Sequence, residues 1–294
     1  MALVAPASPF DRSDFDRGVT ELVRLGLEPV FDETIFAREP MVAGPAAMRA
    51  TAFSHAFTRD DVDAVIAVRG GYGSVELLPA LDADVLRRHR TAFVGYSDVT
   101  SLHVYLNCQV GLASVHGAMV GSRLANGPSC YDPGSFLASL GTEPMGELAT
   151  DGLVSVQPGE ARGPIFGGTL TQIVGSLGTP FSFEPPAGHV LLIDEVAERP
   201  YRLRRALMQL RLSGRLARAA AVVFGQLPRC DEPGGSIGAI DVVREFFADF
   251  PGPVIFGFAT GHTTTPLLSV PLGVETRVIA AAASRLVLEE AAAE

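Results

Sequence analysis

A serine at a sharp turn is the first candidate for chemistry in this chain. Gly95-Tyr96-Ser97-Asp98 lies between an apolar run that suits a buried strand and a helix-like segment. A serine at such a turn has its hydroxyl lifted above the edge of the sheet. The backbone N–H of Asp98 would point at an oxyanion developing on a substrate. The segment departs from the Gly-x-Ser-x-Gly pattern at its last glycine, and either Ser97 or Asp98 suits a helix cap. Spacing alone leaves nucleophile and cap as open alternatives.

An acid and a histidine in the second half of the chain could complete a catalytic triad. The apolar run 191–193 ends in Asp194 and Glu195, and His262 occupies a turn after another strand-like run. A carboxylate and an imidazole at two strand ends can meet as the orienting acid and the general base of a Ser–His–acid triad. His116, at a further strand end, competes for the role of base. A lone turn histidine is more often structural, so spacing does not decide the role of His262.

The remaining histidines suit structural or solvated positions. His55 lies in a helix-like segment and His89 lies between two arginines, so both are expected in solvent. His103 follows the serine turn by about one helical turn, where a structural role is favoured. His189 precedes a strand, and we expect it to be exposed.

A glycine-rich turn is the third candidate. Arg69-Gly70-Gly71-Tyr72-Gly73 directly follows the strand-like run 63–68. Glycines allow positive φ and a close approach of the backbone to a ligand, so the N–H groups of this turn could bind an anion. The alternative is an ordinary tight strand–helix turn, because a short glycine run discriminates poorly. The spacing is not that of a dinucleotide-binding fingerprint.

The basic residues of the chain exclude several mechanisms. All 23 are arginine, and there is no lysine. A lysine Schiff base, a pyridoxal phosphate attachment point, a Walker lysine and a Ser–Lys dyad are therefore excluded. The net charge of −10 and a pI near 5.1 argue against a nucleic-acid partner, which needs a basic face. A Ser–His–acid hydrolase needs neither cofactor nor metal, and we expect none.

The cysteines and the N-terminus favour a cytoplasmic protein. Cys108, Cys130 and Cys230 are odd in number and lack metal-ligand spacing, so we expect unused thiols in a reducing compartment. No apolar run reaches the roughly eighteen residues of a membrane span, and no membrane association is expected. The first six residues lack the basic and apolar regions of a secretory signal.

The three candidates need a scaffold that brings strand ends together. In the first 125 residues, strand-like and helix-like segments alternate at the spacing of a parallel α/β sheet. Sites in such sheets form at the carboxyl ends of the strands. The predicted strands of this half are 63–68, 91–95 and 112–115, and its predicted helices are 81–89 and 98–110. The second half has predicted strands at 190–193, 220–226 and 254–257, and a helix at 201–212.

The sequence therefore predicts an α/β protein with its active site between two domains. An N-terminal parallel-sheet α/β domain, 1–125, would carry the nucleophile. A β-richer C-terminal domain, 164–294, would carry the acid and His262. The stretch 126–163 is rich in Gly, Pro, Ser and Thr, and we expect a linker there with a short helix at 135–140.

Seven segments in order resemble the LD-carboxypeptidase family, also called muramoyltetrapeptide carboxypeptidases, which are serine peptidases. Each motif is weak alone, but the order is specific and extends over nearly the whole chain. The segments are Ala5–Pro9, Arg69–Gly73, Gly95–Asp98, His116–Met119, Gly167–Leu170, the acidic stretch leading to Arg199–Arg202, and Gly261-His262 followed by Val270–Val274.

The resemblance implies a two-domain homodimeric enzyme that cleaves an amide between an L-centre and a C-terminal D-residue. The usual substrate of the family is the murein tetrapeptide, from which D-alanine is released in the cytoplasm during wall recycling. By the same resemblance, Ser97 is the nucleophile and His262 the base. The backbone N–H groups of Asp98 and Gly71 would form the oxyanion hole.

The acid is where the chain departs from the family. The family typically has a glutamate as the first acid after the apolar strand, and here that position is Asp194, with Glu195 next. Aspartate can orient an imidazole as glutamate does, although its side chain is one methylene shorter. We expect Asp194 to be the acid and keep Glu195 as the alternative.

Substrate binding is expected at the glycine-rich turn. The terminal carboxylate of the substrate would favour a cation, which in a chain without lysine must be arginine. Arg69 is the candidate by position, with Gly70 and Tyr72 beside it in the same turn.

Two other functions remain open from the sequence. One is an immunity-type serine peptidase of the same fold that cleaves a peptidyl- or aminoacyl-nucleotide antibiotic. An aromatic side chain stacking on adenine would favour it, and the chain has no tryptophan. The other is a non-catalytic binder of wall peptides with a degraded triad, for which the aspartate at position 194 is the only sign.

Overall fold

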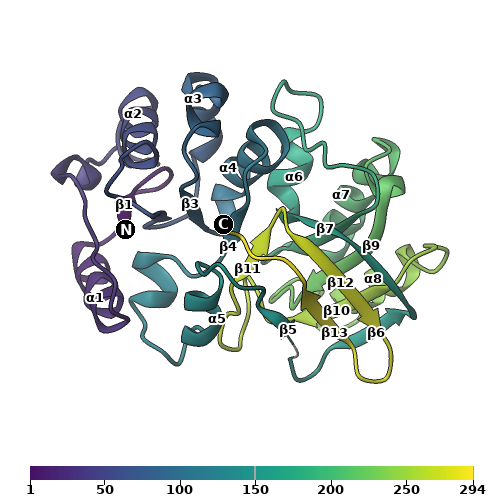
Figure 1. Cartoon of the computed structure of the whole chain (residues 1–294). Coiled ribbons are helices and arrows are strands. Elements are labelled where there is room, and N and C mark those ends of the chain that lie inside the picture. Colours follow the sequence, from purple (N-terminus) through teal and green to yellow (C-terminus); the bar gives the residue numbers. More distant parts are fainter. Residues whose placement is uncertain (149, 294) are drawn as a thin grey trace.

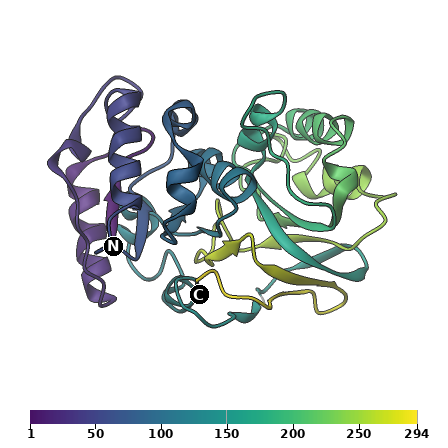
Figure 2. The ribbon, with the colours of Figure 1, turned by 45° about the horizontal axis from the view of Figure 1, so that its top comes forward.

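The structure is a computed structural model that describes residues 1–148 and 150–293. Two lobes lie side by side, and each is built around its own sheet (Figures 1 and 2). Purple and blue segments form most of the first lobe, and green and yellow segments form most of the second.

The first sheet is the parallel sheet that the sequence predicts. Its order is β1-β2-β3-β4-β11, in which β1 to β4 are parallel and β11 is antiparallel to β4. Nearly every residue of these strands is buried, as continuous apolar runs require when helices cover both faces of a sheet. The strands are β1 Ala2–Val4, β2 Ala64–Ala67, β3 Ala92–Gly95, β4 Ser114–His116 and β11 Val270–Leu272.

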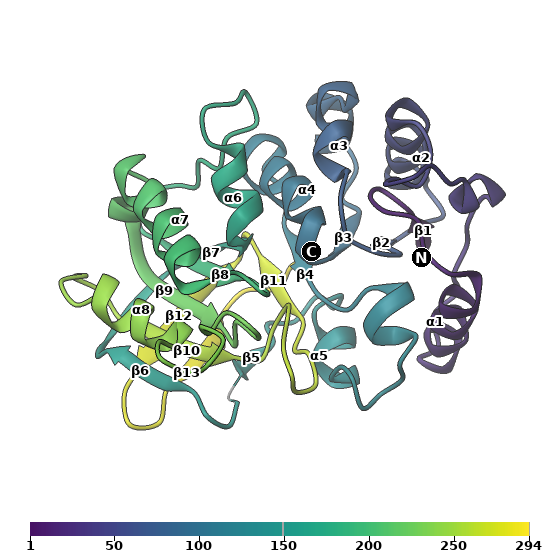
Figure 3. The same ribbon diagram turned by 180° about the vertical axis from the view of Figure 1, so that it is seen from behind.

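Helices lie on both sides of this sheet. α2, α3 and α4 lie on one side, and α1 and α5 lie on the other (Figures 1 and 3). The helix expected over 98–110 is present as three consecutive turns of different pitch, η3, α4 and η4. The helices and short turns of this lobe are α1 Arg12–Arg24, η1 Glu33–Phe36, α2 Ala46–Phe57, η2 Ser74–Ala80, α3 Ala83–Arg87, η3 Ser97–Val99, α4 Thr100–Val104, η4 Tyr105–Val110, η5 Val120–Leu124 and α5 Pro133–Ala138.

The second sheet has eight strands in the order β5-β13-β12-β7-β8-β9-β10-β6. The four strands β7 to β10 are parallel, and antiparallel strands flank them on both sides. The strands are β5 Gly146–Leu148, β6 Val154–Gln157, β7 Gly159–Thr169, β8 His189–Asp194, β9 Ala219–Gly225, β10 Val254–Phe258, β12 Glu275–Ala280 and β13 Arg285–Leu288.

The helices of the second lobe pack on its parallel strands. In α7, Leu203, Leu207 and Leu210 are buried at helical spacing and share an apolar cluster with Leu191 and Ile193 of β8. This packing fixes β8, whose last residue is Asp194. The helices are α6 Leu170–Ser176, α7 Pro200–Leu212, η6 Leu216–Arg218 and α8 Ala239–Phe246.

The predicted α/β class with a parallel sheet and a second, β-richer lobe is confirmed. The stretch 126–163 contains α5, β5, β6 and the first residues of β7, so much of it is regular structure. After β10 the chain returns to the first sheet as β11 before entering β12. The boundaries 1–125, 126–163 and 164–294 stay a proposal.

Candidate active site

Ser97 sits in a strained turn at the carboxyl end of β3. Its φ is 69°, in the left-handed region that costs a non-glycine residue about 1 kcal/mol or more. The turn packs closely on Gly70, where an added Cβ would lie 3.1 Å from Ser97 Cβ. The side chain of Ser97 caps neither η3 nor α4. The local geometry is that of a strand–turn–helix elbow rather than of a capped helix.

The Asp98 carboxylate links the serine turn to two other segments. It accepts a hydrogen bond from Ser74 N at 2.9 Å and another from Gln172 Nε2 at 3.3 Å. Ser74 Oγ in turn donates to the backbone carbonyl of Asp98 at 2.7 Å. Burial raises the pKa of Asp98, against the hydrogen bonds from Ser74, which lower it. The side chain therefore does not cap its own helix but holds the glycine-rich turn beside Ser97.

Asp194 and His262 form the central polar pair. Asp194 Oδ2 lies 2.7 Å from His262 Nδ1, and Asp194 Oδ1 accepts the backbone N–H of His262 at 2.9 Å. The carboxylate is fully buried. Burial raises the pKa of Asp194, but the hydrogen bonds and charge of His262 outweigh it and leave that pKa below its ordinary value. The aromatic ring of Tyr96 meets the imidazole edge-on, with centroids 5.2 Å apart, so His262 lies next to the serine turn.

A glycine before His262 is required by the close approach of this pair. Gly261 has φ +64°, and an added Cβ would lie 2.4 Å from Asp194 Cγ and 2.7 Å from His116 Cε1. Only glycine therefore fits between the acid and the two histidines.

Glu195 points away from the histidine. Its Oε2 accepts hydrogen bonds from Thr171 N at 2.9 Å and Thr171 Oγ1 at 2.6 Å, and its Oε1 accepts one from Val196 N at 3.0 Å. Burial raises the pKa of Glu195. Its carboxylate holds the start of α6, and of the two adjacent acids Asp194 alone is hydrogen-bonded to His262.

His116 is buried and engaged elsewhere. Its Nδ1 lies 3.2 Å from Thr260 Oγ1, whose own proton goes to Leu268 O at 2.8 Å, so Nδ1 carries the proton and donates it. Burial lowers the pKa of His116 to about 4. It is a neutral imidazole behind the Asp194–His262 pair, with no carboxylate on its ring nitrogens.

The other buried histidines have structural roles. His103 bonds Ser114 Oγ and Gly95 O, and burial lowers its pKa to about 3. The expected exposure of His189 is wrong, because its ring is buried against Phe166 and Phe183. As the first residue of a strand covered on both faces, His189 faces inward and donates through Nδ1 to a backbone carbonyl.

The glycine-rich turn has the backbone that the sequence predicts. Gly71 has φ +104°, and an added Cβ would lie 2.4 Å from Ser8 Oγ. Tyr72 N donates to that same oxygen at 3.1 Å. Arg69 is exposed and uses Nη1 to bond Pro9 O at 3.0 Å. Tyr72 is 45% exposed. The turn thus presents both side chains to solvent while its backbone packs on the serine turn.

Two side chains that no motif singles out hold the turn carrying His262. Arg123, in η5 of the first lobe, donates from Nη2 to Thr263 O at 2.6 Å and to Gly261 O at 3.4 Å. Gln226, which follows β9, accepts from Thr264 N at 2.8 Å. Nothing in the sequence separates Arg123 from the other arginines, since its partners are backbone carbonyls distant in the chain.

The described residues hold no group of three His, Cys, Asp or Glu side chains that could bind a metal ion. Burial raises the pKa of the Cys108 and Cys230 thiols to about 11, which leaves them protonated and unreactive near neutral pH. No helix in the described part of the chain is both long and apolar enough to span a membrane.

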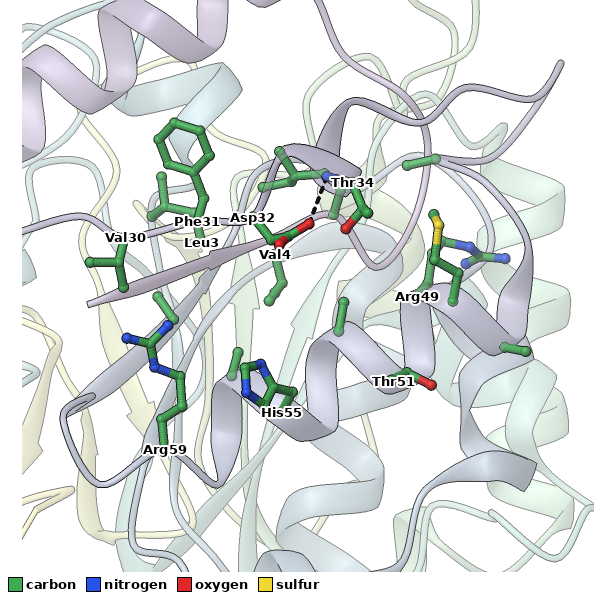
Figure 4. Close-up of a pocket in the computed structure, with 18 residues that line it drawn as sticks. Leu3, Val4, Val30, Phe31, Asp32, Thr34, Arg49, Thr51, His55 and Arg59 are labelled. Atoms are coloured by element: carbon green, nitrogen blue, oxygen red, sulfur yellow. Dashed lines mark hydrogen bonds between the residues drawn. The ribbon is translucent and has the colours of Figure 1, made fainter.

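A cavity of about 570 Å³ lies in the first lobe, away from these residues. Its walls are β1, the segment 30–35 that follows α1, and one face of α2, and Figure 4 shows His55 and Arg59 at one end and Arg49 at the other. The lining includes none of the candidate catalytic side chains.

Known protein families and relatives match this chain over most of its length, with the domains in the order that the sequence motifs predict. The LD-carboxypeptidase N-terminal domain matches residues 1–117, and the LD-carboxypeptidase C-terminal domain matches residues 162–278. A putative carboxypeptidase of Streptomyces coelicolor is 32% identical over 283 residues, covering 93% of this chain and 88% of the relative. The murein tetrapeptide carboxypeptidase of Pseudomonas aeruginosa is 28% identical over 269 residues, covering 89% and 87%.

Solved structures share the fold. The muramoyltetrapeptide carboxypeptidase of Oxalobacter formigenes has a TM-score of 0.86 at 26% identity, covering 99% of this chain and all of that one. The microcin C7 self-immunity protein MccF in complex with glutamyl sulfamoyl guanosine has a TM-score of 0.91 at 21% identity, covering 100% and 96%. The matched domains span most of the chain in the predicted order, and the resemblance is confirmed: the chain belongs to the LD-carboxypeptidase family of peptidases.

Proposed function

We propose that this peptidase is a serine LD-carboxypeptidase that hydrolyses the amide before the C-terminal D-alanine of murein tetrapeptide in cytoplasmic wall recycling. The observation that carries the proposal is the buried Asp194 carboxylate paired with His262 beside the strained Ser97 turn. Relatives named as murein peptide carboxypeptidases in Bacillus subtilis and Pseudomonas aeruginosa support the substrate class.

Each member of the proposed triad has one task. Asp194 accepts a hydrogen bond from the N–H at Nδ1 of His262. The proton is thereby held on Nδ1, and Nε2 is left as the basic nitrogen. His262 takes the hydroxyl proton of Ser97 as the oxygen attacks the substrate carbonyl. The tetrahedral intermediate collapses when His262 returns that proton to the D-alanine nitrogen, and the amine leaves. A water molecule, deprotonated by His262, then attacks the carbonyl of the Ser97 ester. His262 gives the proton to the Ser97 oxygen as the ester bond breaks, which releases the tripeptide and restores the free serine.

The oxyanion of both intermediates would bind two backbone N–H groups, those of Asp98 and Gly71. The carboxylate of Asp98 accepts a hydrogen bond from the backbone N–H of Ser74, the residue after the glycine-rich turn. This bond holds the two N–H groups close to one another. The positive φ of Gly71 turns the backbone of this segment in a way that a larger residue would resist. Arg69, with donors beyond the one held by Pro9, is our candidate for the terminal carboxylate of the substrate, with Gly70 and Tyr72 beside it.

Ser97 makes no hydrogen bond to His262 in the described part of the chain. Catalytic hydrogen bonds are often long in free enzymes and tighten in the substrate complex. The proposed mechanism therefore requires the serine hydroxyl to approach Nε2 when substrate binds.

The test is incubation with L-Ala–γ-D-Glu–meso-diaminopimelate–D-Ala, with mass spectrometry for free D-alanine and the tripeptide. Equimolar release of both products is expected. A preparation that labels with a fluorophosphonate at Ser97 but releases no D-alanine would reject the substrate and keep the serine hydrolase. A preparation that does neither would favour a non-catalytic wall-peptide binder.

The second candidate is an immunity-type peptidase for aminoacyl-nucleotide antibiotics. The match to the microcin C7 self-immunity protein of Escherichia coli, 24% identical over 302 residues and covering 93% of this chain, motivates it. Glutamyl sulfamoyl adenosine, assayed in parallel with the tetrapeptide, separates the two. Preferred cleavage of the nucleotide conjugate would replace our first proposal. We also propose a homodimer, which light scattering of the purified chain would test.

A further inference from the structure

Arg123 connects the first lobe to the turn that carries His262. It lies in η5, packed beside α1, and its half-buried side chain crosses to residues 261–263. Nη2 donates to Thr263 O at 2.6 Å and to Gly261 O at 3.4 Å. These two carbonyls belong to the residues immediately before and after His262. A single guanidinium therefore bonds the backbone on both sides of the imidazole.

The same guanidinium is anchored on its other side. Nη1 donates to Cys130 O at 3.3 Å, and Cys130 N and O are themselves bonded to Gly127 O and Leu267 N. Arg123 thereby joins two backbone segments, the one that contains Cys130 and the turn at 261–263. It forms no ion pair with a carboxylate within the described residues. Its N–H groups bond backbone carbonyls. These bonds fix the position of the two backbone segments and neutralise no carboxylate.

The turn needs such a support because it has no regular structure of its own. Residues 259–268 lie between β10 and β11, outside any strand or helix. Asp194 holds the imidazole and the backbone N–H of His262, and Gln226 holds Thr264 from the second lobe. These contacts come from the ends of β8 and β9. From the lobe that carries Ser97, His116 contacts Thr260 and Cys130 O accepts Leu267 N, and Arg123 is the contact from that lobe that reaches the residues on either side of His262.

We propose that Arg123 is a positioning residue that sets the placement of His262 relative to Ser97 by fixing the carbonyls of Gly261 and Thr263. The inference rests on the proposed role of His262 as general base. Nη2 carries two N–H groups and can bond both carbonyls while Nη1 bonds Cys130 O. A methionine of similar length has no donor for any of the three. A displacement of the imidazole by about 1 Å is enough to cost catalysis about 100-fold.

The matched pair for the test is Arg123→Met and Arg87→Met. Arg87 also bonds two backbone carbonyls, those of Val110 at 3.0 Å and Gln109 at 3.0 Å, but at the end of α3, remote from His262. Arg123→Met is expected to lower kcat on the tetrapeptide by about 10- to 100-fold with KM within about twofold, because a misplaced His262 weakens proton transfer in the transition state and leaves substrate binding nearly unchanged. Arg87→Met is expected to keep kcat within about twofold. Unchanged kcat in Arg123→Met, or equal losses in both variants, would overturn the inference.

A second readout does not depend on substrate. The proton between His262 Nδ1 and Asp194 is expected to give a low-field proton resonance, which its loss in a His262→Gln variant would assign. Arg123→Met is expected to shift or broaden this resonance, whereas Arg87→Met and Ser97→Ala leave it in place. An unshifted resonance in Arg123→Met contradicts the positioning role. If the wild-type chain releases no D-alanine while the resonance still moves in Arg123→Met, the proposed function fails and the positioning of His262 stands.

Discussion

The carboxylate of Asp194 takes two hydrogen bonds from His262, one from Nδ1 at 2.7 Å and one from the backbone N–H at 2.9 Å. Oδ2 also accepts a longer bond from Thr169 Oγ1 at 3.4 Å. Because each oxygen accepts a bond from His262, the acid fixes the orientation of the ring and the position of its backbone together. The neighbouring carboxylate of Glu195 is committed to Thr171 and its own turn. Asp194 thus orients His262, whereas Glu195 holds its own turn and the start of α6, and substitutions of the two acids can separate these roles.

Asp194→Asn is expected to lower kcat by about 10³- to 10⁴-fold, whereas Glu195→Gln costs mainly stability, about 1 kcal/mol. An asparagine must present its NH₂ group to one of the two donors of His262. If that donor is Nδ1, the ring is driven to the tautomer whose Nε2 carries a proton and cannot accept one from Ser97. Tetrapeptide kinetics and urea unfolding of both variants provide the measurement. A larger kcat loss in Glu195→Gln would reassign the acid.

Gly71→Ala is expected to lower kcat by about 10- to 100-fold, because the substituted turn misplaces an oxyanion donor. Its Cβ would meet Ser8 Oγ at 2.4 Å, in addition to the strain of φ +104°. Gly26→Ala is the control, since Gly26 has φ +82° and no atom within 4 Å of an added Cβ. Gly26→Ala is expected to lose about 1 kcal/mol of stability from backbone strain alone, and Gly71→Ala more, because of the added overlap with Ser8; urea unfolding measures both. Full activity in Gly71→Ala would remove this turn from the oxyanion hole.

Acid is expected to destabilise the fold between about pH 6.5 and 4. Burial lowers the pKa of His189 and of His116 to about 4, so in this range the unfolded chain binds protons that the folded chain does not. The stability that these two histidines contribute is fully present above about pH 6.5, the pKa of a histidine in the unfolded chain. It is lost as the pH falls toward 4. Asp98 and Glu195, whose pKa values burial raises, act in the opposite direction.

His189→Asn isolates one of these contributions. The asparagine amide can still donate to the Pro186 carbonyl that His189 Nδ1 bonds, but it does not titrate. The variant is expected to be less stable at pH 7, from lost ring packing, and to lose stability less steeply between pH 6.5 and 4. Urea unfolding at several pH values measures the slope. A slope equal to that of the wild type would show that His189 is accessible to protons in the folded state.

The local scaffold could be predicted because its signals are local. The strands β2, β3, β8, β9 and β10 are mostly apolar runs, which is typical of parallel strands buried on both faces. Gly71 and Gly261 are glycines whose positive φ the turns require. The places where these strands end then locate the serine turn, the glycine turn and the acidic pair.

What could not be predicted depends on contacts between distant segments. No pattern in the sequence shows which of the two adjacent acids bonds His262. The outcome depends on Thr171 of α6, which is distant in the chain and whose hydroxyl bonds the Glu195 carboxylate. The burial of His189 depends on Phe166 and Phe183. The role proposed for Arg123 could not be predicted either, because its partners are backbone carbonyls, which every residue has.

The release of D-alanine from murein tetrapeptide by the wild-type chain and by Ser97→Ala, measured beside their thermal unfolding, tests the central claim most directly. The triad account predicts that the variant folds as the wild type does and releases no D-alanine above the uncatalysed background, while the wild type releases it in step with the tripeptide. Retention of most of the wild-type rate by a folded Ser97→Ala would contradict the assignment of the nucleophile and the mechanism built on it.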